Sequence, residues 1–406
     1  MKKIFTILSC VALLFAVVSC APKERHAKYV FYFIGDGMGA THVAAAEAYL
    51  AQKRGAIDLD PLCFTQFPVM GQAISCSANS IITDSSAAGT ALSTGEKTNN
   101  GMLCIAPDSV TILTPISYKI HDAGYSVGVM SNTPINHATP ASFFGHNVKR
   151  GNYYEIGSEI PGTGFEFFGG GGLYHPNGRN KDKEHNLYDM IAEGGYTIAY
   201  GYDDFQAKKD ADHIVLVQAE GSEDICPYAL GRPEGALTLS QIVDAAITVL
   251  ERNPKGFFLM AEGGLIDWTA HSNDLAGTIF EVLDFDQAIA VALDFYDRHP
   301  DETLIVVTAD HETGGISLGG KGYTYDLTVI DKIKESTTTT DLEKYMNDQQ
   351  MKTDINTEAR IGWTTGSHTG GPVPVWAKGV GSERFAARQD NTDIPKKICA
   401  AMGVQF

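Results

Sequence analysis

Short apolar runs alternate with helical patterns along most of this chain, and this alternation constrains the fold more than any other feature. The apolar runs are rich in β-branched and aromatic residues, which are typical of strands; they cover residues 29–34, 126–130, 256–260 and 304–308. Strands that alternate with helices predict an α/β fold, with a largely parallel central β-sheet sandwiched between helices. Helical periodicity is found over residues 40–52, 112–122, 139–149, 237–252 and 275–298.

Two stretches interrupt the alternation. Residues 151–183 are rich in glycine and polar residues, and residues 319–358 contain four consecutive threonines and only weak periodicity. We interpret both as insertions at the surface of a single domain that spans residues 27–406. Gly169–Gly172 in the first stretch is interpreted as a turn, because it does not match the glycine spacing of a dinucleotide-binding loop.

The first twenty residues are expected to be a secretory signal peptide. Lys2 and Lys3 precede an apolar run over residues 4–18 that is short for a bilayer span. The run leads to Ser19-Cys20, which resembles a bacterial lipoprotein cleavage site, and Cys20 would then carry a lipid anchor. The alternative is an ordinary signal peptide with an incidental cysteine. The sequence therefore predicts an exported protein of the periplasm or cell envelope, held at a membrane through Cys20.

The charge of the chain argues against a nucleic-acid-binding protein, and its cysteines argue against a structural zinc site. The chain has 49 acidic and 31 basic residues, a formal net charge of −18, and no visible basic face that would attract nucleic acid. Five cysteines follow Cys20, and none forms a C-x-x-C pair, so a cysteine-based structural zinc site is not expected. Five is an odd number, and the disulfide pairing stays open. The five are at positions 63, 76, 104, 226 and 399.

Acidic and histidine side chains follow the predicted strands, and such side chains collect at one edge of a parallel sheet. Asp36 stands between glycines just after the first strand, and Glu262 follows the strand over 256–260. Asp267 and His271 are four residues apart, so one turn of helix would place both on one face, as a metal half-site requires. Each residue also has an ordinary interpretation, as a turn or a helix cap.

Two further segments strengthen the metal interpretation. Asp310 and His311 directly follow the strand over 304–308, and His368 stands among small residues. Each segment alone could be an exposed loop. Together, histidines and carboxylates without a thiolate indicate catalytic zinc, with ligands for two or three ions.

Ser85 is a candidate nucleophile. It follows Asp84 and begins a run of small residues with helical character, so its hydroxyl would lie where free N–H groups attract anions. No histidine base is near it in sequence, and a metal would have to lower its pKa. The alternative is that Asp84 or Ser85 only caps the helix. Arg150, at the end of the predicted helix over 139–149, is either a phosphate clamp or an exposed arginine.

The motifs together resemble those of the alkaline phosphatases, in the family's order. The matching segments are Gly35-Asp36-Gly37-Met38-Gly39, Thr83-Asp84-Ser85, Ser93–Thr98, Ala138-Thr139-Pro140, Glu262-Gly263 through Asp267 and His271, Thr308–His311, and Ser367–Gly370.

The resemblance implies an alkaline phosphatase-like fold and a phosphomonoesterase that forms a phosphoserine on Ser85. One zinc ion would be held by Asp267, His271 and His368, and a second by Asp36, Asp310 and His311. A third ion, usually magnesium, would lie among Asp36, Thr139 and Glu262. Arg150 falls where the family's phosphate-clamping arginine is found. The substrates would be small phosphate monoesters; the resemblance also admits a homodimer, with residues 319–358 near its interface or the active site.

Two positions depart from the best-known bacterial pattern of the family. His137 stands where that pattern has aspartate, and Trp268 where it has lysine. The first change leaves open whether magnesium or zinc fills the third site. The second is expected to weaken the binding of product phosphate.

Two alternatives to a monoesterase are retained. A phosphodiesterase of the same superfamily would need room for a second ester group near Arg150. A non-catalytic lipoprotein that binds metal or phosphate would keep the ligands without turnover. A sulfatase is excluded, because Ser86-Ala87-Ala88-Gly89 lacks the sequence that formylglycine formation requires.

Overall fold

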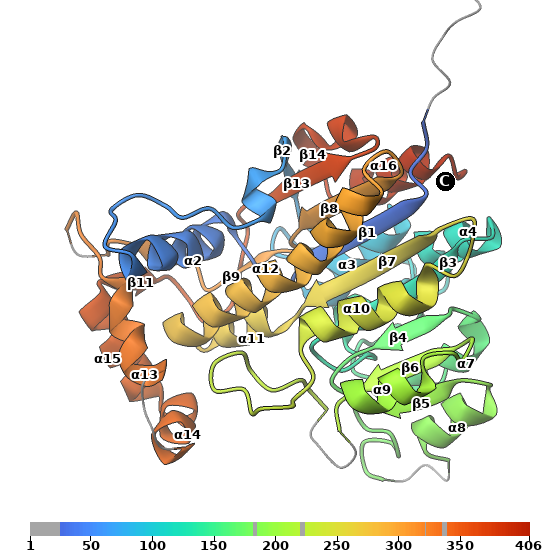
Figure 1. Cartoon of the computed structure of the whole chain (residues 1–406), viewed down its shortest axis with the longest axis horizontal. Helices are drawn as coiled ribbons and strands as arrows, with labels where there is room; N and C mark the ends of the chain where they lie inside the picture. The colour runs from blue at the N-terminus through green and yellow to red at the C-terminus, as the bar shows by residue number, and fades with distance from the viewer. Residues whose placement is uncertain (1–24, 182–184, 220–223, 321, 335–338) are drawn as a thin grey trace, which may run out of the picture.

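The computed structural model describes residues 25–181, 185–219, 224–320, 322–334 and 339–406 (Figure 1). Its centre is a ten-stranded sheet in the order β14-β2-β13-β8-β1-β7-β3-β4-β6-β5. All neighbouring strands run parallel except at β13, which is antiparallel to both β8 and β2. The strands are β1 (Tyr29–Gly35), β2 (Val69–Ile74), β3 (Ser126–Ser131), β4 (Phe167–Gly169), β5 (Thr197–Tyr200), β6 (Ile214–Val217), β7 (Phe257–Gly263), β8 (Thr303–Thr308), β13 (Val373–Gly379) and β14 (Ala387–Asp390).

Strand β1 lies in the middle of this sheet, and every one of its residues is buried. Its register places Phe31 opposite Leu259 of β7 on one side and Ile305 of β8 on the other. A strand with helices over both faces has to be apolar along its whole length, since neither row of side chains meets water. The uninterrupted aromatic and β-branched run of β1 is therefore a consequence of its central position.

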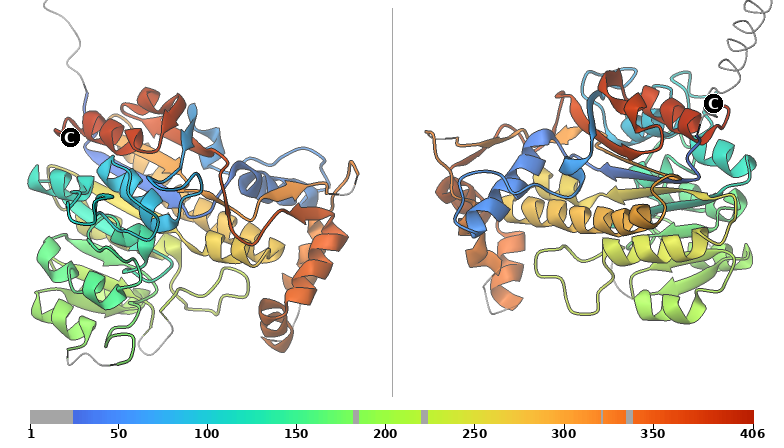
Figure 2. Two further views of the ribbon diagram at one scale, coloured as in Figure 1. Left: turned by 180° about the vertical axis from the view of Figure 1, so that it is seen from behind. Right: turned by 45° about the horizontal axis from the view of Figure 1, so that its top comes forward.

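Helices cover both faces of the sheet (Figures 1 and 2). On one face, α10 (Leu239–Leu250) packs on β3, β4 and β7, and α12 (Leu275–Arg298) packs on β1, β7 and β8. On the other face, α4 (Ile116–Asp122) and α5 (Ala138–Ala141) contact β3, next to α3 (Ser85–Thr94) and α16 (Asp393–Met402). The predicted α/β sandwich with a mostly parallel sheet is confirmed.

The remaining elements connect or extend this core. Two small antiparallel pairs, β9 with β12 and β10 with β11, lie outside the main sheet. The other elements are α2 (Ala40–Lys53), η1 (Phe64–Gln66), α6 (Tyr153–Gly157), α7 (Ile160–Thr163), α8 (Leu187–Glu193), α9 (Tyr202–Lys208), α11 (Leu265–His271), β9 (Glu312–Thr313), β10 (Ile316–Leu318), η2 (Leu327–Ile330), α13 (Asp331–Lys334), α14 (Thr339–Asn347), α15 (Gln349–Ala359), β11 (Ile361–Trp363), β12 (His368–Thr369) and η3 (Ser382–Phe385).

The predicted helix over residues 139–149 is wrong beyond its first turn. The helix α5 ends at Ala141, and the chain then turns and becomes extended. The Ser142 hydroxyl donates to the carbonyl of Thr139, and Asn147 exchanges two backbone hydrogen bonds with Leu103 as an isolated β-bridge. This tertiary pairing overrides the local helical preference. Arg150 therefore follows a bridge rather than a helix terminus.

The stretch over residues 151–183 is not wholly a surface insertion. It contains β4, which lies between β3 and β6 inside the central sheet, so the glycine run begins at the end of a buried strand. The second stretch forms η2, α13, α14 and α15, and in Figure 1 α13–α15 project from one flank of the molecule. Thr337 and Thr338 lie outside the described residues.

The five cysteines after Cys20 are all free thiols in the structure. The expected signal peptide and Cys20 lie outside the described residues. Within the described ranges, no helix combines the length and the apolar character that crossing a membrane demands.

Candidate active site

The acidic and histidine side chains that follow the strands meet at one edge of the sheet. Ile34 of β1 is opposite Glu262 of β7 and opposite Thr308 of β8, so the residues just after these strands emerge side by side. Ser131, the last residue of β3, is also opposite Glu262. Asp36 directly follows the last residue of β1, and Asp310 follows the last residue of β8 by two positions. The register thus brings four segments that are distant in sequence to a single place.

The first cluster consists of Asp36, Asp310 and His311, all completely buried. The Nε2 atom of His311 lies 3.4 Å from Asp36 Oδ1 and 3.2 Å from Asp310 Oδ2. One oxygen of Asp310 accepts the backbone N–H groups of Gly37 and His311 at 3.1 and 2.9 Å. Its other oxygen, and both oxygens of Asp36, are buried without a hydrogen-bond partner. Buried carboxylate oxygens that lack a donor fit a bound cation.

The second cluster consists of Asp267, His271 and His368. Helix α11 carries the first two one turn apart, and His271 Nε2 lies 3.3 Å from Asp267 Oδ2. His368 Nε2 lies 3.2 Å from His271 Nε2 and 3.7 Å from Asp267 Oδ1. The outer ring nitrogens are fixed by carbonyl oxygens, of Gly366 for His271 and of Thr83 for His368, each at 2.8 Å. Such outer partners orient a histidine so that its inner nitrogen is presented to a metal.

A third group lies at the end of β7. Glu262 is completely buried, and its Oε2 atom accepts hydrogen bonds from Ser131 and from Thr133, the latter at 3.2 Å. Its Oε1 atom has no hydrogen-bond partner. Thr139 of α5 is next to Glu262, and the charge of Glu262 acts on Asp36. Oxygen donors without nitrogen or sulfur are the set that magnesium prefers.

Ser85 is the first residue of α3 and lies between these clusters and solvent. Asp84 caps the helix by accepting the Ala87 N–H at 2.9 Å, so the cap and the candidate nucleophile are different residues. The Ser85 hydroxyl oxygen lies 3.3 Å from His311 Nε2. Arg150 donates to Asp84 Oδ2 at 3.1 Å, which places its guanidinium beside Ser85. The pocket in front of the serine is lined by Ser85, His137, Arg150, Tyr228, Asp267, Trp268, His271 and His368.

In the first and third groups, burial and then the neighbouring carboxylates disfavour the ionised form of the acids. Burial, together with the neighbouring carboxylates, raises the pKa values of Asp36 and Asp310 well above the usual range. Burial likewise raises the pKa of Glu262 to about 7, against the opposing effect of the neighbouring hydroxyls of Ser131, Thr139 and Thr133. Carboxylates packed in this way stay ionised only when a cation offsets them. The electrostatics therefore agree with the unpartnered oxygens.

The second cluster is balanced differently. Burial acts to raise the pKa of Asp267, but the hydrogen bond from His271 and the nearby histidines lower it overall. The same hydrogen bond raises the pKa of His271 to about 9. Burial and the charge of Arg150 lower the pKa of His137 to about 3, so this ring is neutral at ordinary pH.

All the predicted site residues lie in these three groups or along the pocket beside them, but three contributors were missed. Thr313 donates from its hydroxyl to Asp267 Oδ1 at 2.5 Å and lies 3.3 Å from His311 Nδ1. Asn132 accepts the N–H groups of Gly264 and Leu265 at the start of α11. Tyr228 comes from a loop with no strand signal. Of these, Thr313 could have been found, because it stands two residues after His311 in a predicted site segment.

Comparison with known proteins gives a consistent result. The family model described as "Alkaline phosphatase" matches residues 27–169 and 173–404. Alkaline phosphatase 3 of Bacillus subtilis (strain 168) is 32% identical over 424 residues, which cover 92% of this chain and 89% of the relative.

Two solved structures are similar over almost their whole length. The cold-active alkaline phosphatase of a psychrophilic Shewanella sp. superposes with a TM-score of 0.79 at 29% identity, covering 92% of this chain and 99% of that one. A mutant of the TAB5 alkaline phosphatase, solved with Mg bound in its M3 site, gives a TM-score of 0.76 at 29% identity and covers 95% and 100%.

Proposed function

The chain belongs to the alkaline phosphatase family and is a phosphoric monoester hydrolase, and from this premise we propose that Ser85 is its nucleophile, working at a centre of two zinc ions and one magnesium ion. The observation that carries the proposal is the position of the Ser85 hydroxyl, 3.3 Å from His311, which itself lies within 3.4 Å of Asp36 and Asp310. Both oxygens of Asp36 and one oxygen of Asp310 are buried without a hydrogen-bond donor, so the protein alone does not stabilise their charges. Cations held by these carboxylates would offset the charges close to the Ser85 hydroxyl.

The donor chemistry supports the choice of metals. Asp267, His271 and His368 would hold one zinc ion, and Asp36, Asp310 and His311 the other, since imidazole and carboxylate together suit zinc. Asp36, Thr139 and Glu262 would hold the third ion, and their oxygen donors suit magnesium. The TAB5 relative carries Mg in its M3 site in a mutant that has glutamate in place of a histidine. His137 has an unpartnered buried Nδ1 atom, which keeps zinc at the third site as an alternative. When bound, such ions lower the pKa of a hydroxyl or a water and stabilise the charge of the transferring phosphoryl group.

The chain's own residues would carry the reaction in two displacements. The Ser85 oxygen, with its proton removed, attacks phosphorus; a serine–phosphorus bond forms, the ester bond breaks, and the departing alcohol oxygen takes up a proton. A water molecule then attacks the phosphoserine, phosphate leaves, and Ser85 regains its proton. Arg150 would hold two non-bridging oxygens through its planar fork, directed there by its contact with Asp84. Positioning and electrostatics account for most of phosphoryl-transfer catalysis.

A comparison of ester classes tests this function. Purified enzyme is assayed with p-nitrophenyl phosphate and with the bis(p-nitrophenyl) diester, before and after chelation and with zinc and magnesium added back. Monoester turnover well above diester turnover, lost on chelation and restored by zinc, is the expected result. Preference for the diester would move the function to a phosphodiesterase. In parallel, Ser85→Ala should remove turnover by several orders of magnitude while zinc stays bound; turnover close to that of the unchanged enzyme would refute the nucleophile.

We also propose that the protein is exported to the periplasm or cell envelope and held there by a lipid on Cys20, and that it forms a homodimer. The pattern Lys2-Lys3, apolar run and Ser19-Cys20 supports the anchor, although these residues lie outside those the structure describes. Mass spectrometry of the N-terminal peptide from membranes tests it: a diacylglyceryl Cys20 is expected, and a free Ala21 or an unmodified Cys20 would refute it.

Sedimentation at micromolar concentration tests the homodimer, which a monomer mass would refute.

A further inference from the structure

An aromatic wall leads away from the pocket that contains Ser85. Trp268 and His137 line that pocket, and their rings meet edge to face, 5.6 Å apart between centroids. Trp268 lies parallel to Tyr174 at 6.5 Å and an angle of 7°, and His137 stacks on Tyr153 at 6.4 Å and 22°. Two successive ring contacts therefore connect the metal-binding helix α11 with Tyr153, at the start of α6.

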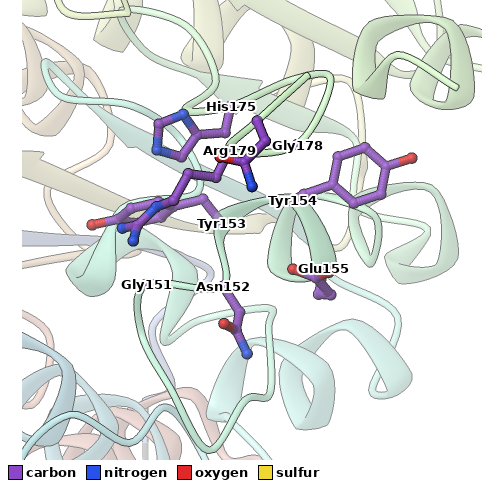
Figure 3. Close-up of a pocket in the computed structure, with 9 residues that line it drawn as sticks. Gly151, Asn152, Tyr153, Tyr154, Glu155, His175, Gly178 and Arg179 are labelled. Carbon is purple, nitrogen blue, oxygen red and sulfur yellow. The ribbon is translucent and has the colours of Figure 1, made fainter. Parts of the chain in front are cut away.

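A second cavity, of about 230 Å³, opens at the far end of this wall (Figure 3). Tyr153 is common to the wall and the cavity. In Figure 3 the side chains of Tyr153, His175 and Arg179 lie together on one side of the cavity, while Tyr154 and Glu155 lie on the other. His175 contacts both tyrosines of the wall, at 5.7 Å from Tyr153 and 5.9 Å from Tyr174. Planar rings in successive contact thus form a path between the pocket that contains Ser85 and the cavity.

This path is held in place by a buried amide. Asn136 donates from its side chain to the carbonyl oxygens of Tyr153 and Tyr174, at 2.8 and 2.9 Å, and accepts the Tyr174 N–H at 2.8 Å. Asn136 is completely buried, whereas both tyrosines keep part of their surface exposed. A surface whose backbone is fixed before a ligand arrives binds it at a lower entropic cost.

The charge of the second cavity differs from that of the whole chain. Arg179 is exposed, and no carboxylate among the described residues forms an ion pair with it. Glu155 lines the opposite side. In a protein with a net charge of −18, an anionic group is attracted here only by a local cation. Arginine also stacks on aromatic rings and binds carboxylate or phosphate through its fork.

We propose that the wall and the cavity form a subsite for the leaving group, and that this subsite favours phosphate monoesters of aromatic alcohols that carry a second negative charge at their far end. The aromatic group would lie along Trp268 and Tyr174, and the second anion would meet Arg179. A small aliphatic ester would fill only the pocket in front of Ser85. The inference rests on the proposed function and adds the substrate class to it.

The experiment compares four substrates that differ only in the leaving group. They are phenyl phosphate, 4-carboxyphenyl phosphate, its uncharged carboxamide, and a biphenyl phosphate with a carboxylate on the far ring; the last tests the reach of the cavity. Arg179→Gln removes the charge of an exposed side chain. Arg388→Gln, at an exposed position in the edge strand β14, is the matched control.

The expected result is a lower KM for at least one carboxylate ester than for its uncharged counterpart. Arg179→Gln should raise the KM of that carboxylate ester by about two- to fivefold, and Arg388→Gln should leave it unchanged. The KM for phenyl phosphate should be unchanged in Arg179→Gln. Tyr153→Leu should raise the KM of all aromatic esters by about two- to tenfold, with methyl phosphate unaffected. Equal KM values for charged and uncharged esters, or equal effects of the two arginine changes, would overturn the subsite. Failure to hydrolyse phenyl phosphate at all would instead refute the proposed function.

Discussion

The buried ion pair between Arg232 and Asp284 offers a test of how this chain holds the loop over its active site. Arg232 donates to the two oxygens of Asp284 at 2.6 and 2.8 Å, and to the carbonyl of Pro227 at 3.2 Å. The side chains are 14% and 5% exposed. The same loop carries Tyr228 to the pocket that contains Ser85. We consider the change Arg232→Met, which keeps most of the side-chain volume and removes the charge.

The magnitude follows from the burial of the partner. Removing one member of a buried pair leaves an uncompensated charge and costs about 3–5 kcal/mol of the free energy of unfolding, whereas an exposed pair contributes about 0–1 kcal/mol. The effect should be large here because Glu281, one turn from Asp284 on α12, is also buried. Burial and the charge of Asp284 raise the pKa of Glu281 to about 8, and Arg232 is among the groups that lower it.

The pH dependence has a definite sign. An acid whose pKa is raised in the folded state contributes stability that is complete below its ordinary pKa and is lost as the pH rises through the folded value. Glu281 is therefore largely protonated at pH 6 and ionised at pH 9. Without Arg232 its pKa rises further, so Arg232→Met should lose more stability at pH 9 than at pH 6.

Urea unfolding followed by circular dichroism at both pH values measures these differences. Arg54→Met is the matched control, because Arg54 pairs with Asp58 and Asp60 at the surface. The double variant Arg232→Met with Asp284→Leu should recover most of the loss, since an apolar pair replaces the stranded charge. A loss for Arg232→Met no greater than that for Arg54→Met, or a double variant less stable than the single one, would refute the reasoning.

Three shorter predictions concern the metal centre and the product. Chelation of the loaded enzyme should lower the unfolding temperature in differential scanning fluorimetry, because ions that bind only the folded chain stabilise it by about 2.7 kcal/mol at a hundredfold excess over Kd; an unchanged temperature would contradict the assigned metal clusters. Thr313→Val should weaken zinc binding by about 10–100-fold, because the hydrogen bond to Asp267 is lost. Competition with a chromophoric chelator measures the Kd, and a Kd equal to that of the unchanged enzyme would argue against a positioning role for Thr313. Trp268→Lys should strengthen inhibition by inorganic phosphate severalfold, because a cation would replace an indole beside the phosphate pocket; equal or weaker inhibition in the lysine variant would refute this.

The centre of the fold was predictable because its strands are buried on both faces. Every residue of β1, β3, β7 and β8 is buried, and the middle of each strand is a run of apolar residues. A polar segment follows each run, so both the strand and its end are visible in the sequence. The outer strands β4, β5 and β6 have only three or four residues each, and strands this short are hard to distinguish from connecting segments. Helix 139–149 failed for a different reason, since the pairing of Asn147 with Leu103 is a contact between distant segments.

The site residues also divide into those that are visible in the sequence and those that depend on contacts between distant segments. The proposed ligands Asp310 and His311 are visible because they closely follow a strong strand. The hydroxyl of Thr313, the amide of Asn132 and the ring of Tyr228 act through contacts that depend on tertiary geometry, and their residue types are common in loops of any protein. The roles of Asn132 and Tyr228 could not be inferred from spacing, because each contacts a segment distant from its own in sequence. Thr313 is visible in part, because it stands two residues after His311, but its partner Asp267 is distant in sequence.

The central position of β1 also has a consequence for the synthesis of the chain. This strand is made first, yet both of its neighbours, β7 and β8, come from the second half of the sequence. Until they emerge, a nascent chain contains a seven-residue aromatic and β-branched segment with two open edges, which is the pattern that promotes intermolecular pairing. Contacts of such long sequence separation also form slowly. A chain interrupted before β7 therefore cannot form this sheet and is prone to aggregate, and a complete chain must be kept apart from its neighbours until synthesis ends.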